Sequence, residues 1–323
     1  MGKRDAVGKK YFANKKRFAD LMNAFLFDGK QVVVSQKLRE LDPNEMIYLE
    51  WGVTKRNKPS REDEAIQKVR GILKEAVINY DGHCCYVLLG VENQTDLYYA
   101  MAVRSMLYDA LNYTQQIADI AKFHEKQEGR KSTKDYFTGM RKTDKLVPVI
   151  TIVVYWGPDS WDAPRSLHEM FPEDIPQEIL DLVPDYKIPV LAPCEVENPD
   201  LFQTDLKAVI KALQVMNDKK ALKTLLRGPE FQSLEHDAAV AIQAATNLKI
   251  KIPETKEVNM CKAVQEWREE LLTEGETIGT VKGEAKLARL IAAMSKQGDS
   301  AKIAQAAADP EFRAKMYEKY GIK

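Results

Sequence analysis

Cysteine is scarce in this sequence, long apolar runs are absent, and neither sign of charge is in excess. The 323 residues contain four cysteines with no CxxC pair, which disfavours a disulfide framework or a structural zinc site. Lysine plus arginine total 48, as do aspartate plus glutamate, so no global positive field attracts nucleic acid. Without a run of about 18 apolar residues or an apolar N-terminal segment, we expect a cytoplasmic protein with no membrane partner.

Motifs for nucleotide binding and nucleophilic catalysis are also missing. The chain has no GxxxxGK[ST] or GxGxxG loop to surround phosphates and no GxSxG turn. Its four histidines form no HExxH motif. We therefore expect no nucleotide cofactor.

Strand and helix signals alternate in the first half of the chain. Strand formers occupy 72–80 and 84–91, on either side of an Asp81-Gly82 turn, and 148–156 is a third apolar run. A long amphipathic helix is expected between them, over 99–124. This order predicts a mixed α/β core. Shorter elements are expected at 17–27 and 61–70, as helices, and at 31–34 and 46–51, as extended segments.

The second half has mainly helical spacing. Helices are expected at about 204–217, 219–226, 229–246, 257–274, 300–308 and 310–320. We divide the chain into an α/β core, a helical extension and a helical tail, at 1–170, 171–272 and 273–323. In the tail, glycine recurs at every fourth residue, which would let two helices approach closely or would mark a frayed helix: Gly275, Gly279 and Gly283.

The first 17 residues are rich in lysine and arginine. Runs of like charge are usually solvated. We therefore interpret this segment as a solvated lead-in, with contact to a phosphate backbone as the alternative.

The candidate site lies at the end of the second strand. Glu92 and Gln94 are two residues apart, so their side chains share one face of that strand. A carboxylate and a second polar group in this arrangement form the ExK or ExQ half-site of metal-dependent nucleases, in which the carboxylate binds a hard cation such as Mg²⁺. The alternative is a plain surface charge beside a glutamine that satisfies backbone groups.

The expected hairpin indicates where a second metal-binding carboxylate should lie relative to Glu92. If Asp81-Gly82 is the turn, paired residue numbers sum to 163, so position 71 faces Glu92. That position is Gly71, which supplies no ligand. Other acids that could replace it are Asp63, Glu64 and Asp20, and we favour Asp20.

The expected helix over 99–124 has two stripes. Its apolar stripe, the usual core-facing side, includes Val103 and Leu107. A polar line beside it includes Arg104, Tyr108 and Gln115, which either flanks the site or is a solvated flank.

Three stretches resemble a known family. They are RFADLMNAFLFDGK (17–30), LLGVENQTDLYYAMAVRSMLYDALNYTQQI (88–117) and LVPVITIVVYWGPDSWDAPRSLHEMF (146–171). In them the chain resembles the recombination-promoting nucleases (Rpn), also called putative transposases, of the PD-(D/E)XK superfamily. The resemblance implies a nuclease-like core, a mixed sheet flanked by helices, over 1–170 and Mg²⁺-dependent cleavage of DNA.

The resemblance also implies roles for residues. Glu92 would bind the metal, with Asp20 at an acidic position of the first helix, and Gln94 would replace the catalytic lysine. Arg104, Tyr108 and Gln115 match the helix that flanks the site, where they would either contact DNA or only flank the site.

The chain departs from the family at the aspartate expected where Gly71 stands. Loss of that acid would lower the cleavage rate by about 10²-fold or more. We therefore carry two main hypotheses, a metal-dependent DNA endonuclease and a catalytically inactive DNA-binding or regulatory homologue that pairs with an active paralogue. A homo-oligomer is also considered, and a plain protein-interaction scaffold is a third interpretation.

Overall fold

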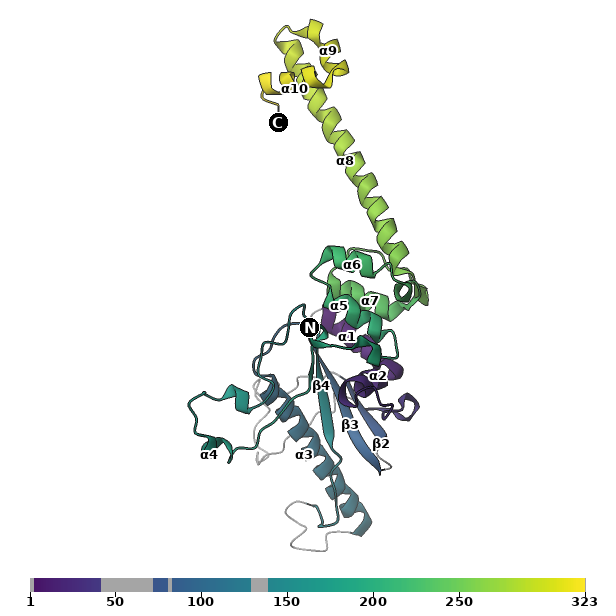
Figure 1. Cartoon of the computed structure of the whole chain (residues 1–323), viewed down its shortest axis with the longest axis vertical. Coiled ribbons are helices and arrows are strands. Elements are labelled where there is room, and N and C mark those ends of the chain that lie inside the picture. Colours follow the sequence, from purple (N-terminus) through teal and green to yellow (C-terminus); the bar gives the residue numbers. More distant parts are fainter. Residues whose placement is uncertain (1–2, 42–71, 81–82, 129–138, 323) are drawn as a thin grey trace. The chain divides into compact units, whose positions relative to one another are not determined.

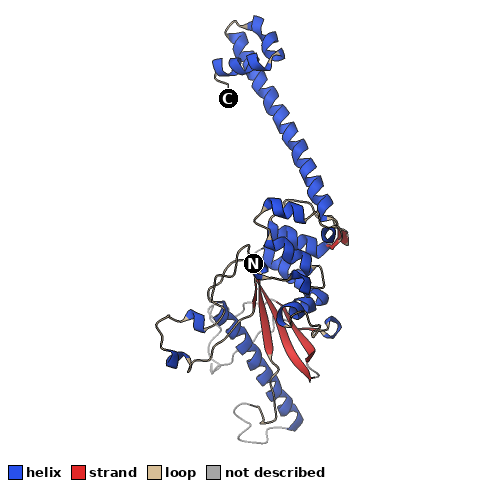
Figure 2. Cartoon of the chain, in the orientation of Figure 1, coloured by secondary structure: helices blue, strands red, loops and turns tan. Residues whose placement is uncertain are grey.

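A computed structural model describes residues 3–41, 72–80, 83–128 and 139–322 (Figure 1). The chain divides into two compact units, Met1–Cys261 and Lys262–Lys323. The extended segment predicted at 46–51 and the helix predicted at 61–70 lie outside the described residues. Figure 2 shows a sheet with helices around it in the first unit and helices alone in the second.

The first unit contains a mixed five-stranded sheet in the order β1-β2-β3-β4-β5. Strand β2 runs antiparallel to both β1 and β3, whereas β4 lies parallel to both β3 and β5. The predicted mixed α/β class is therefore confirmed. The strands are β1 (Arg39–Leu41), β2 (Ile72–Tyr80), β3 (His83–Gln94), β4 (Val149–Tyr155) and β5 (Val190–Leu191).

Three parts of the sheet differ from the predicted strands, and one of them is the edge strand β1, which lies between the two extended segments predicted at 31–34 and 46–51. The segment predicted as extended at 31–34 contributes only an isolated bridge, from Val33 to Ile78, within the described residues. The short edge strand β5 was not predicted, because the prolines around it are typical of a loop.

The β2-β3 hairpin has the predicted register. Ile72 faces Val91 and Tyr80 faces His83, so paired numbers sum to 163. Gly71 lies outside the described residues. The centre of β3 is apolar. Leu89 and Val91, which share one face of the strand, have 0% exposure, whereas Tyr86 on the other face is 60% exposed.

Helix α3 (Met101–Glu128) confirms the predicted long helix but turns a different face to the sheet. Val103 and Leu107, in the predicted apolar stripe, are exposed, whereas Ser105, Tyr108 and Asp109 are buried. The interpretation of that stripe as the core-facing side was wrong. The buried polar face is stable because its groups have partners on the sheet, as described below.

The N-terminal segment buries one of its faces, so its interpretation as a solvated lead-in was wrong for that face, although Lys10, Lys15 and Lys16 are exposed. It forms α1 (Lys3–Ala13), in which Tyr11 and Phe12 have 0% exposure. Both rings pack on Trp156, at centroid distances of 6.4 and 6.0 Å. The lysines dominate the sequence of α1, but the aromatic pair Tyr11 and Phe12 attaches this helix to the sheet.

A helical layer covers α1 and the next helix, α2. In Figure 1, α1 and α2 lie beside α5 and α7, and inter-element contacts join α1 to α7 and α2 to α5. Asn14 caps α2 by accepting hydrogen bonds from the Lys16 and Arg17 amides. The helices of this region are α2 (Lys15–Leu26), α5 (Leu206–Gln214), α6 (Lys219–Leu225) and α7 (His236–Thr246), and the short helix α4 (Gln177–Leu180) lies elsewhere in the first unit.

The second unit consists of helices, so the predicted helical C-terminal half is confirmed. The three helices are α8 (Met260–Lys296), α9 (Ile303–Ala308) and α10 (Pro310–Lys319). Leu290, Met294 and Ala306 form its small core. Across the described residues, no helix has the length and apolar character needed to cross a membrane.

Candidate functional site

Glu92 lies at the end of β3 and is 4% exposed. Its Oε1 accepts a hydrogen bond from Arg104 Nη2 at 2.6 Å and another from Gln94 Nε2 at 3.2 Å. On the neighbouring strand, Val153 faces Glu92 and Tyr155 faces Gln94. The structure therefore brings together Glu92, Gln94 and Arg104, three of the residues selected from the sequence.

Arg104 is held in place from several directions. Its Nε donates to Tyr108 Oη at 3.2 Å, and the guanidinium carbon lies 5.4 Å from the Tyr98 ring centroid and 5.6 Å from that of Tyr108. Burial lowers the pKa of Arg104, but the Glu92 carboxylate and Tyr108 outweigh this, so the pKa is raised. The site is therefore a largely buried ion pair between Glu92 and Arg104, with the rings of Tyr98 and Tyr108 beside the guanidinium.

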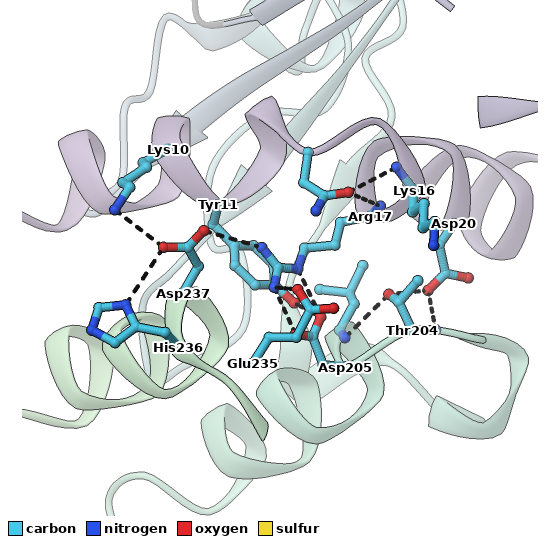
Figure 3. A network of polar contacts seen from close by, with 12 residues as sticks. Lys10, Tyr11, Lys16, Arg17, Asp20, Thr204, Asp205, Glu235, His236 and Asp237 are labelled. Carbon is cyan, nitrogen blue, oxygen red and sulfur yellow. Dashed lines mark hydrogen bonds and ion pairs between the residues drawn. The ribbon is translucent and has the colours of Figure 1, made fainter. Parts of the chain in front are cut away.

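Gln115 and Asp20 have other partners. The Gln115 amide donates to Asp119 Oδ1 at 2.9 Å on the exposed surface of α3. The Asp20 carboxylate is 4% exposed and accepts three bonds, from the Gln203 amide and from the amide and hydroxyl of Thr204, at 2.8, 2.8 and 2.5 Å. Figure 3 shows Asp20 beside Thr204. Its described contacts tie α2 to the loop before α5.

Asp109 is a buried acid that the sequence analysis did not select. It is 6% exposed, and its carboxylate accepts hydrogen bonds from Tyr186 Oη at 2.5 Å and Thr151 Oγ1 at 3.3 Å. Thr151 faces Gly90, which lies two residues before Glu92, so Asp109 covers the same face of the sheet as Glu92. The available signal was the i, i+4 spacing of Asp109 from Ser105, which is also buried.

The residues around Glu92 do not fit a divalent cation. Within the described ranges, no three His, Cys, Asp or Glu side chains lie close enough to hold a metal ion. The Glu92 carboxylate instead contacts a guanidinium, whose positive charge would repel a metal ion. Asp63, Glu64 and Gly71 lie outside the described residues.

A second polar network holds α1 and α2 against the helical layer (Figure 3). Arg17 is 2% exposed and donates to both oxygens of Asp205, at 2.8 Å each, and to Glu235 at 2.7 Å. Tyr11 Oη donates to Asp205 Oδ1 at 2.9 Å. Burial, followed by the Asp205 charge, raises the pKa of Tyr11 well above its usual value.

This network reaches the candidate site through α1. An added Cβ on Gly8 would lie 2.8 Å from Asn93 Oδ1, so α1 packs closely on the residue between Glu92 and Gln94. Asn93 points to the opposite face of β3 and accepts a hydrogen bond from Trp156 Nε1 at 2.8 Å. The Arg17 network therefore holds α1 against the face of β3 opposite to Glu92 and Gln94.

Comparison with known proteins identifies one family. The model of a family described as "putative transposase, YhgA-like" matches residues 76–238, which is half of the chain. The match covers β3, α3 and β4 and so includes the candidate site. No curated protein and no solved structure matches the chain.

Proposed function

Because the chain belongs to the family of YhgA-like putative transposases, we propose that it binds DNA at the end of β3 without cutting it efficiently. Family membership supports DNA as the partner. In this role the chain is a DNA-binding or regulatory relative of an active nuclease.

The ion pair between Glu92 and Arg104 carries this proposal. A metal-dependent nuclease needs a carboxylate that is available to the cation, and usually more than one. Here the Glu92 carboxylate contacts Arg104 Nη2 at 2.6 Å. A buried carboxylate with a guanidinium partner is already neutralised, so it gains little from a metal ion.

Two further residues support the same conclusion. Position 71, where the family resemblance implies an aspartate, is glycine. Asp20, the favoured replacement, accepts hydrogen bonds from Gln203 and Thr204 and so has a structural use. We therefore derive no step through Mg²⁺ for this chain.

The test is a paired assay of DNA binding and plasmid nicking with the full chain. Wild type, Gly71→Asp and Glu92→Ala are incubated with supercoiled plasmid in Mg²⁺, Mn²⁺ or EDTA. We expect wild type to retard DNA in EDTA at low salt, where electrostatic binding is strongest. We expect wild type to nick no faster in Mg²⁺ or Mn²⁺ than in EDTA, and we expect the same of Gly71→Asp, because the added carboxylate leaves Glu92 paired with Arg104.

Two results would contradict the proposal. Metal-dependent nicking by wild type that Glu92→Ala abolishes would establish an active nuclease. A wild-type chain that does not retard DNA at low salt would exclude DNA binding and favour a protein-interaction role.

A further inference from the structure

Arg104 and Arg17 both form ion pairs inside the first unit, but they differ in how much of the side chain reaches solvent. The Arg17 side chain is 2% exposed, and Asp205 and Glu235 surround it. The Arg104 side chain is 23% exposed, although its partner Glu92 is only 5% exposed. Part of the Arg104 guanidinium is therefore fixed by hydrogen bonds within the protein, and part of it is accessible to a ligand.

The fixed end sets the direction of the guanidinium. Nη2 donates to Glu92 and Nε to Tyr108, which leaves the guanidinium with further N–H donors. The rings of Tyr98 and Tyr108 lie 5.4 and 5.6 Å from its central carbon and restrict its plane. A planar, preorganised set of N–H donors matches the oxygens of a phosphate group.

We propose that Arg104 is the phosphate-binding group of this site and that Glu92 is its counter-ion, which orients the guanidinium and weakens its hold on DNA. This inference rests on the proposed DNA binding and adds the group that performs it. In this arrangement the guanidinium supplies the positive charge that a metal ion supplies in a nuclease, so phosphate binding needs no metal.

As a counter-ion, Glu92 should affect DNA affinity in the opposite direction to a metal ligand. Removing a metal-binding carboxylate weakens metal-dependent DNA binding. Removing a counter-ion leaves Arg104 with uncompensated charge beside the phosphate, which strengthens binding. Glu92→Gln keeps a hydrogen-bond acceptor for Arg104 and removes only the charge.

The chain offers a matched control pair. Arg165 Nη2 contacts Glu195 Oε2 at 2.5 Å, with side chains that are 37% and 34% exposed. Glu195→Gln changes the net charge of the protein by the same amount as Glu92→Gln. A general electrostatic effect would appear equally in both variants.

The experiment measures fluorescence anisotropy of a labelled DNA duplex of about 20 base pairs with the full chain, in EDTA and separately in Mg²⁺, over a range of salt concentrations. We expect Glu92→Gln to tighten binding about 10-fold. Arg104→Gln should weaken it about 10-fold and lower the slope of log affinity against log salt by about one. The double variant should bind like Arg104→Gln, and Glu195→Gln should stay within about 2-fold of wild type.

Several outcomes would overturn the inference, and they separate it from the proposed function. If wild type binds DNA but neither Glu92→Gln nor Arg104→Gln changes the affinity, DNA binding stands and Arg104 is not its phosphate contact. If Glu92→Gln abolishes binding that requires Mg²⁺, Glu92 is a metal ligand. If no variant binds DNA, the proposed function itself fails. Thermal melting of each variant confirms that the chain is folded in every measurement.

Discussion

Replacing Arg17 by methionine should destabilise the first unit more than any exposed charge substitution. Arg17 and Asp205 are both largely desolvated, with side chains 2% and 13% exposed. Without Arg17, Asp205 keeps the 2.9 Å bond from Tyr11 but loses two charged donors. Removing one partner of a buried ion pair costs about 3–5 kcal/mol. Glu235 is 61% exposed and can be rehydrated, so it adds little to this cost.

Urea unfolding followed by tryptophan fluorescence measures the effect. Trp156 is a suitable reporter because it is 3% exposed and packs on Tyr11 and Phe12 of α1. Arg17→Met should lower the free energy of unfolding by about 3–5 kcal/mol. Adding Asp205→Asn should recover part of that loss, since the remaining amide is uncharged and still accepts the Tyr11 hydrogen bond.

Lys10→Met is the matched control, because Lys10 pairs with Asp237 at 3.1 Å but is 71% exposed. Its cost should be below about 1 kcal/mol. Two results would refute the reasoning. Either Arg17→Met costs no more than Lys10→Met, or the Arg17→Met/Asp205→Asn double variant is less stable than Arg17→Met alone.

Two other substitutions test buried polar groups, Asp20 and Lys74, which are 4% and 0% exposed. Asp20→Ala should cost about 1–3 kcal/mol, because it leaves the partly buried amides of Gln203 and Thr204 without their acceptor. DNA affinity in EDTA should stay within about 2-fold, and a larger loss would indicate that Asp20 contacts the ligand. Burial lowers the pKa of Lys74 below its usual value, so the folded state loses this proton before the unfolded state does. The free energy of unfolding should therefore rise with pH from the lowered pKa up to about 10.4, and Lys74→Met should remove that rise; identical pH profiles for the two proteins would contradict the assignment.

Local signals in the sequence predicted the sheet core well. The Asp81-Gly82 turn and the apolar runs on both sides of it fixed the pairing of β2 with β3, because a two-residue hairpin leaves one register. The end of β3 was also predictable, since Glu92 and Gln94 interrupt an apolar run. These features depend on neighbouring residues alone.

The contacts of α1 and Asp20 depend on distant parts of the chain. Tyr11 and Asp20 find their partners at Asp205 and Thr204, almost 200 positions away. A segment rich in lysine is typical of solvated surface, and a first-helix acid is an ordinary candidate ligand. No spacing within α1 or α2 indicates that α5 and its preceding loop cover them.

The orientation of α3 decides what neutralises Glu92, and hydrophobic periodicity predicted that orientation wrongly. Successive residues turn by about 100° around a helix, so Arg104 lies between the exposed stripe of Val103 and the buried face of Asp109. Packing the apolar stripe on the sheet would rotate the helix by about half a turn and carry Arg104 to the opposite flank. The hydrogen bonds from Thr151 and Tyr186 to Asp109 hold the observed orientation instead. Because these bonds set the rotation of α3, the Arg104 guanidinium lies against the Glu92 carboxylate, in the position that a cation would otherwise take.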